Sequence, residues 1–106
     1  MPHMTATLPN QETLARIKQR AGAISKISPH ECRDYSLHRS PLHPGSLILR
    51  WLSIDIGDID HPRQCYEYEC FEEDGQPLHC SVFYDSPAEA EAFFQSLTPI
   101  CKLKDC

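Results

Sequence analysis

The segment QCYEYECFEEDGQPLHCSVFYD, residues 64–85, predicts a β-hairpin, because two alternating runs flank the turn residues Glu73-Asp74-Gly75. A three-residue loop with Gly75 in the left-handed conformation sets Glu72 opposite Gln76. In that register, one face of the hairpin carries only apolar or amphipathic side chains: Tyr66, Tyr68, Cys70, Leu78, Cys80, Val82 and Tyr84. A two-residue turn would shift the register by one position and mix charged residues into this face, so we expect the three-residue loop.

Upstream of the hairpin, the segment SLILRWLSIDI, residues 46–56, predicts another strand because it is rich in β-branched and aromatic side chains. Apolar residues lie on both of its faces, with Leu47, Leu49 and Trp51 on one and Ile48, Leu52, Ile54 and Ile56 on the other. This pattern is typical of a strand that is central in a sheet or well covered.

A helix is predicted on each side of these strands. The first helix begins with Asn10 as its N-cap, ends before Pro29, and has one apolar stripe made of Leu14, Ile17, Ala21 and Ile24. The second helix begins with the capping box Ser86-Pro87-Ala88-Glu89, ends before Pro99, and has an apolar stripe made of Ala90, Phe93, Phe94 and Leu97.

The remaining segments lack an apolar period. Residues 28–45 contain three prolines and three histidines, and we expect them to form a long loop. We also expect a disordered N-terminus over residues 1–9 and a C-terminal tail on the surface over residues 99–106. His3-Met4 is also what a cloning site encodes, so we expect residues 1–3 to be foreign to the native chain. The expected fold is one α+β domain over residues 10–98, ordered α-β-β-β-α, with a three-stranded antiparallel sheet and two helices on one face.

This order of elements resembles that of the double-stranded-RNA-binding domain, a likeness of topology that covers residues 10–98. That family carries a basic cluster at the start of its second helix, where this chain has Glu89 and Glu91. Because RNA binding needs cations against phosphate, we expect no direct binding of nucleic acid.

Charge is divided unevenly along the chain. Residues 1–50 hold seven basic and three acidic side chains (+4), residues 51–98 hold one basic and eleven acidic ones (−10), and the last eight residues add +1, which gives the net charge of −5. Such a split indicates either an electrostatic partner or mutual screening of the two halves within the chain.

Six cysteines could suggest zinc, but the tight Cys-x₂-Cys pairs of structural zinc sites are absent. Cys65 and Cys70 are five residues apart, which places them on opposite faces of a strand. His79 and Glu69 form a predicted cross-strand pair, yet no nucleophile elbow or glycine-rich phosphate loop accompanies them. We therefore predict no enzyme, no metal and no other cofactor, and a zinc-stabilised domain is the third alternative for function.

No apolar run is long enough to span a bilayer, and the N-terminus has no secretion signal. We accordingly expect a cytoplasmic protein without a membrane partner, whose cysteines are reduced.

The outer face of the sheet is the predicted binding surface, because aromatic side chains on a solvent face commonly anchor an interface. Its expected partner-binding residues are Trp51, Glu67, Glu69, Phe71 and Phe83. They suggest a small interaction or regulatory module that binds a protein partner of unknown identity or forms a homodimer. The alternative structural interpretation is that the loop of residues 28–45 covers these aromatic rings.

A different function is suggested by the carboxylates. Glu67 and Glu69 lie roughly 6.8 Å apart along the strand, close to the spacing of phosphates. Further acidic residues extend this surface: Asp58, Asp60, Glu72, Glu73 and Asp74. The second candidate function is therefore an acidic mimic of nucleic acid that inhibits a nucleic-acid-binding protein.

Overall fold

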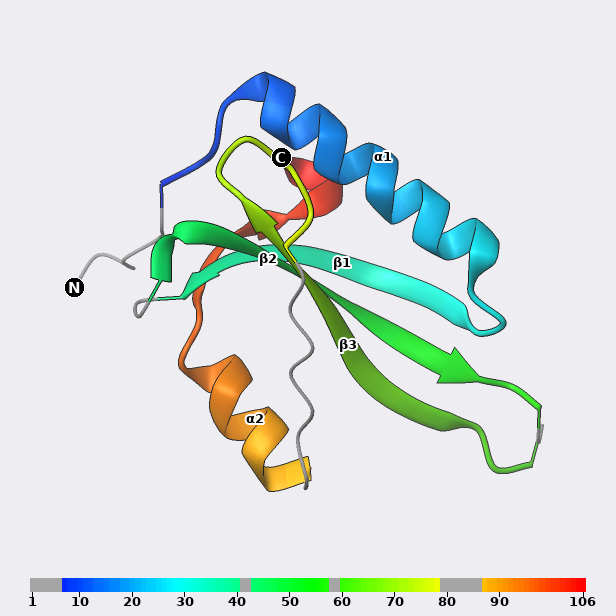
Figure 1. The fold of residues 1–106 in the computed structure, drawn as a ribbon. Coiled ribbons are helices and arrows are strands. Elements are labelled where there is room, and N and C mark those ends of the chain that lie inside the picture. Colours follow the sequence, from blue (N-terminus) through cyan, green and yellow to red (C-terminus); the bar gives the residue numbers. More distant parts are fainter. Residues whose placement is uncertain (1–6, 41–42, 58–59, 79–86) are drawn as a thin grey trace.

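The protein is an α+β domain in which two helices pack against one antiparallel sheet (Figure 1). The structure is a computed structural model that describes residues 7–40, 43–57, 60–78 and 87–106. Its elements are α1 (Gln11–Ile27), β1 (Glu31–Ser40), β2 (His43–Asp55), β3 (Arg63–Glu72), α2 (Pro87–Gln95), β4 (Thr98–Lys102) and the 3₁₀ turn η1 (Leu103–Asp105). The sheet has four strands in the order β3-β2-β1-β4, so the prediction of three strands was wrong.

Helix α1 confirms the sequence-based expectation. The Asn10 side chain accepts a hydrogen bond from the Thr13 amide at 2.8 Å, which satisfies one of the free donors at the helix start. The helix ends at Ile27, ahead of Pro29. Its predicted apolar stripe is buried in full: Leu14, Ile17, Ala21 and Ile24.

The hairpin register is also confirmed as far as residue 78. The Glu72 amide donates to the Gln76 carbonyl, the Leu78 amide donates to the Cys70 carbonyl, and Gly75 has a φ of +88°. The predicted continuation of this second strand through residues 79–85 lies outside the described residues.

Strand β1 corrects the prediction that residues 28–45 form a loop. Its side chains are mostly polar and prolines flank it, so its sequence lacks the usual strand pattern. Backbone pairing stabilises the strand instead, because β1 forms hydrogen-bonded ladders with β2 on one side and with β4 on the other. A bulge at Asp34, with a φ of 59°, interrupts the ladder with β2.

Strand β4 corrects the prediction of a surface tail over residues 99–106. It pairs with β1 at the edge of the sheet, and Leu103 of η1 is buried in the core. Pro99 is compatible with this strand because an edge strand tolerates a missing amide donor. Of the N-terminal residues 1–9, the structure describes 7–9, and there Pro9 is buried.

The two helices cover opposite faces of the sheet, whereas both were expected on one face. Helix α1 packs over a core that includes Leu37, Leu47, Leu49, Trp51, Phe71 and Leu103. Helix α2 packs with Phe94 against a smaller group on the other face, which includes Ile48, Tyr68, Cys70 and Leu78. Leu97, which follows the helix, joins this group. The central strand β2 is thus covered on both faces, as its sequence predicts.

Cys101 and Cys106 form a disulfide, with their Cα atoms 5.9 Å apart, so the expectation of reduced thiols was wrong for this pair. Cys32 and Cys65 are free thiols. Among the helices described, none is long and apolar enough to cross a membrane. A cytoplasmic location stays a prediction.

Candidate functional site

The aromatic residues predicted to bind a partner lie in the core. Trp51 is 5% exposed and Phe71 is 1% exposed, both beneath α1. The Trp51 ring packs against Tyr35, with ring centroids 5.8 Å apart. The expectation that Trp51 and Phe71 lie on an open outer face was therefore wrong, and Phe83 lies outside the described residues.

The carboxylates on the same face are engaged by basic residues of this chain. Arg20 of α1 donates two hydrogen bonds to Glu69, at 2.8 and 3.1 Å. Glu67 lies opposite Trp51 in the register and is half-buried. The row of open carboxylates predicted along β3 is therefore partly neutralised by α1.

The acidic hairpin tip is held in a similar way. Arg39 donates to both carboxylate oxygens of Glu73, at 2.6 and 2.8 Å, and Arg16 donates to the Asp74 carbonyl at 2.6 Å. The hydrogen bonds from Arg39 hold the pKa of Glu73 below its usual value. Of the other predicted acidic residues, Asp60 and Glu72 are exposed, and Asp58 lies outside the described residues.

These contacts show that the two oppositely charged halves screen each other in part. Of the ten lysines and arginines, four form ion pairs with described carboxylates: Arg16, Arg20, Arg33 and Arg39. Four of the other six line a single pocket. Positive charge that the fold leaves uncompensated is therefore concentrated in one place.

The pocket has a volume of about 690 Å³ and opens where β4 ends beside the bulge of β1. Four cationic side chains and one carboxylate line it, together with two phenol rings, a hydroxyl and a leucine: Lys18, Arg50, Lys102, Lys104, Asp34, Tyr35, Tyr66, Ser36 and Leu103. An anionic ligand would meet a clear excess of positive charge there, although the whole chain is acidic.

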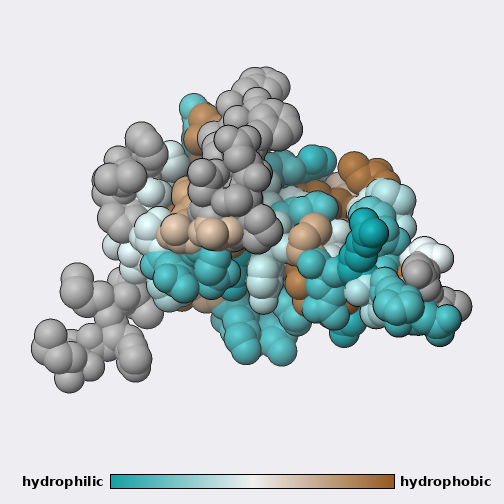
Figure 2. Space-filling view, turned by 90° about the horizontal axis from the view of Figure 1, so that it is seen from below, coloured by the Kyte–Doolittle hydropathy of each residue, from teal (hydrophilic) through white to brown (hydrophobic). Residues whose placement is uncertain are grey.

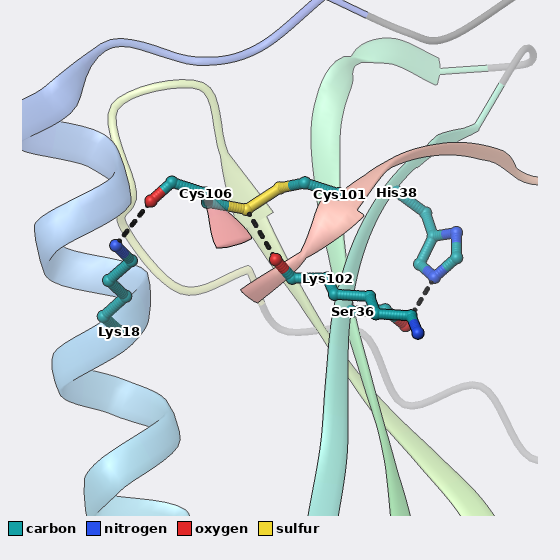
Figure 3. Close-up of a disulfide and its surroundings, with 6 residues drawn as sticks. All are labelled: Lys18, Ser36, His38, Cys101, Lys102 and Cys106. Atoms are coloured by element: carbon teal, nitrogen blue, oxygen red, sulfur yellow. Dashed lines mark hydrogen bonds between the residues drawn. A yellow bond between two sulfur atoms is a disulfide. The ribbon is translucent and has the colours of Figure 1, made fainter. Parts of the chain in front are cut away.

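Three of these residues form a row across the sheet. Ser36 of β1 pairs with Lys102 of β4 on one side and with Arg50 of β2 on the other. Directly opposite residues in antiparallel strands have Cα atoms about 4.5–5.5 Å apart, so the row spans about 10 Å. Figure 3 shows Lys102 extending beside Ser36. Two long cationic side chains thus flank one short hydroxyl.

Arg50 is oriented by aromatic rings instead of a carboxylate. Its guanidinium carbon lies 4.5 Å from the centre of the Tyr66 ring and 5.3 Å from that of Phe94. Its Nε is buried and has no hydrogen-bond partner among the described residues. Stacking holds the planar group in place while its donors remain unused, which is a favourable arrangement for binding an anion.

His38 holds Ser36 in position. The Nε2 of His38 lies 2.8 Å from the Ser36 oxygen, as the dashed line in Figure 3 shows. Burial, and to a smaller extent the charge of Arg50, lowers the pKa of His38 to about 4, so the ring is neutral near pH 7. Its Nδ1 is buried without a described partner.

An unpaired buried N–H is rarer than an unpaired acceptor, which places the imidazole proton on Nε2. His38 then donates to Ser36, and the Ser36 hydroxyl is left to donate into the pocket. A base that abstracts a proton from serine would need the opposite tautomer. With the proton on Nε2, His38 does not act as a base toward Ser36.

Sequence analysis did not find this site because Ser36 and His38 fall in a predicted loop and Lys102 in a predicted tail. One signal was present, a lone Arg50 within the apolar segment SLILRWLSIDI. No cluster of three histidine, cysteine or acidic residues that could hold a metal occurs in the part of the chain that the structure describes.

The side of the molecule that carries α2 is shown in Figure 2. Hydrophilic residues cover most of the coloured surface there, and apolar residues show in separate patches.

Comparison with known proteins leaves the site as the main guide to function. No protein-family profile matches the chain, and neither a curated protein nor a solved structure shows significant similarity to it.

Proposed function

We propose that the protein is a small non-enzymatic interaction module that binds an acidic segment of a protein partner in the pocket around Arg50. The single observation that carries this proposal is the state of Arg50, which is stacked on two rings and has no ion pair or hydrogen bond with any described residue. Because no described carboxylate engages its guanidinium, a bound carboxylate or phosphate could accept charge-assisted hydrogen bonds from it.

The surrounding lysines support the same proposal. Lys102 and Lys104 are exposed and form no ion pair with a described carboxylate. Lys18 donates to the Cys106 carbonyl at 2.8 Å, which holds its ammonium group at the pocket (Figure 3). Lysines at the rim increase the rate at which an acidic partner associates, and Arg50 supplies the oriented contact.

The test is binding of fluorescent peptide pools measured by polarisation, with one pool rich in aspartate and glutamate and a matched pool rich in lysine. We expect the acidic pool to bind and Arg50→Gln to weaken it at least tenfold, since a charge-assisted bond contributes about 1.5–3 kcal/mol. Lys26→Gln is the matched control, because it removes the same charge from the exposed end of α1, outside the pocket. Equal binding by both variants would contradict the proposal.

Acidic mimicry of nucleic acid receives less support, because Glu69 and Glu73 already bind Arg20 and Arg39. The exposed Asp60 and Glu72 still permit it. Under that alternative, charge reversal at Glu72 would abolish partner binding while Arg50→Gln would leave it intact.

A further inference from the structure

We propose that the row Lys102–Ser36–Arg50 is a phosphoryl-binding subsite, so that the acidic segment the pocket takes is a phosphorylated one. This inference rests on the proposed function and makes it more specific. The row offers three kinds of donor, a guanidinium, a hydroxyl and an ammonium group, and a tetrahedral phosphoryl dianion is the ligand group that fits them best.

The donors are arranged in a way that suits phosphate better than carboxylate. Arg50 offers a planar fork, which alone can satisfy the two oxygens of a carboxylate. Ser36, positioned by His38, adds a hydroxyl donor beside that fork, and Lys102 adds an ammonium group on the far side of the same hydroxyl. A phosphoryl group has three terminal oxygens and about −1.5 to −2 charge at pH 7, so it can engage all three donors at once.

The charge of the rest of the chain favours a single phosphoryl group over a polynucleotide. The pocket has an excess of cations, but Asp34 lies in its lining and the whole chain carries a net charge of −5. Nucleic-acid binding gains affinity from many phosphate contacts along an extended basic surface. One phosphorylated side chain would place its charge in the pocket without bringing further phosphates against the acidic remainder.

The experiment compares degenerate nonapeptide pools that differ at the central position: phosphoserine, phosphothreonine, phosphotyrosine, glutamate and unmodified serine. Binding of each pool is measured by fluorescence polarisation, alongside a single-stranded RNA oligonucleotide and competition by inorganic phosphate. The variants are Ser36→Ala, which removes the central donor and no charge, and the control Lys26→Gln. Far-UV circular dichroism checks that each variant is folded.

We expect at least one phosphorylated pool to bind tenfold or more tightly than the glutamate pool, and inorganic phosphate to displace it. Ser36→Ala should remove most of that preference. Lys26→Gln should retain the preference.

Equal binding of phosphorylated and glutamate pools would overturn the phosphoryl subsite and leave the proposed function standing. Failure of every acidic pool would overturn both. RNA binding that exceeds binding of the phosphopeptides, and that is lost in Ser36→Ala, would show that the phosphoryl groups recognised are those of a nucleic acid and would refute a phosphorylated protein partner.

Discussion

Replacing Glu73 with glutamine tests whether the acidic hairpin tip belongs to the fold or serves as a free surface. In the structure, both oxygens of Glu73 accept hydrogen bonds from Arg39 of β1. The Arg39 side chain is only 10% exposed, whereas that of Glu73 is 55% exposed. Glutamine keeps the shape and one acceptor oxygen but removes the charge, so the variant isolates the electrostatic part of the contact.

The expected cost lies between the limits for exposed and buried ion pairs. Exposed pairs contribute about 0–1 kcal/mol, and breaking a buried pair costs about 3–5 kcal/mol. The exposure of Glu73 requires a reduction for solvent screening, and Arg39 keeps its bond to the Thr7 carbonyl. We expect Glu73→Gln to lower the free energy of unfolding by about 1–2 kcal/mol at pH 7.

The pH dependence gives an independent check on the sign. Because the folded protein holds the pKa of Glu73 below its unfolded value, this contact stabilises the fold fully above about pH 4.5, the unfolded pKa. The stabilisation is lost as the pH falls through the lowered pKa, when the carboxylate becomes protonated. The stability difference between the native protein and Glu73→Gln should therefore shrink below pH 4.5.

The assay is urea unfolding followed by the fluorescence of Trp51, the single tryptophan, which is buried. With a urea slope of about 2 kcal/mol per molar, the midpoint should fall by roughly 0.5–1 M. Glu72→Gln is the matched control, since Glu72 is adjacent and exposed. If both variants shift the midpoint equally at pH 7, the Arg39 contact is not what stabilises the tip.

The same unfolding assay tests further changes in the core, at the disulfide and at two glycines. Phe71→Ala should cost about 3–5 kcal/mol, because the ring is 1% exposed beneath α1; a small effect would restore its interpretation as a surface anchor. Reducing the Cys101–Cys106 disulfide with dithiothreitol should cost about 2 kcal/mol from loop-closure entropy, and a Cys101→Ala, Cys106→Ala double variant should not respond to the reductant. Gly75→Ala should destabilise the protein by about 1–2 kcal/mol, because the φ of Gly75 is +88° and a Cβ there would lie 3.2 Å from the Arg16 side chain. Gly22→Ala in α1 should instead stabilise the protein by up to about 1 kcal/mol, because alanine favours the helix more than glycine does. The glycine prediction fails if the two alanine variants shift stability in the same direction.

Local signals in the sequence predicted α1 and the hairpin turn well. A capping residue, a helical apolar period and a glycine suited to a left-handed turn each act within a few residues, so they can be recognised without the rest of the fold. The Asn10 cap and the positive φ of Gly75 are both present in the structure. The register they set holds up to the last described pair, Cys70 and Leu78.

Strands β1 and β4 could not be predicted in the same way because partners create them. The polar segment ECRDYSLHRS becomes a strand between β2 and β4, where both backbone edges find hydrogen bonds. Strand β4 in turn depends on β1 for its pairing. Tertiary context overrides weak strand propensity in such segments, and nothing in either segment alone reveals the other.

The error over Phe71 and Trp51 came from the assumption that one face of the sheet is open. The alternation correctly separates the two sets of side chains, but it cannot tell which helix covers which face. The apolar residues on both faces of β2 were the available warning, because a strand with two apolar faces requires cover on both.

The fold also changes the candidate site from an acidic surface, as the sequence suggests, to a basic pocket. In the sequence, the acidic half looks like the active surface because its charge density is the greater. In the fold, Glu69 and Glu73 are neutralised by Arg20 and Arg39, which belong to the basic half. Lys18, Arg50, Lys102 and Lys104 are left to share one pocket.

Four cationic side chains that line one pocket without forming ion pairs to described carboxylates raise a question that paired charges do not raise: what balances their charge. Like charges gathered in a pocket repel one another, and a bound anion relieves that repulsion. Arg50 makes the argument sharper, because two aromatic rings orient it and its buried Nε lacks a described partner. If Arg50 were retained only to stabilise the fold, Arg50→Met would lower the free energy of unfolding. The unsatisfied buried Nε predicts the opposite, because methionine removes that donor and keeps the apolar contact. A gain of stability together with a loss of binding to acidic peptides would show that Arg50 is retained for its ligand.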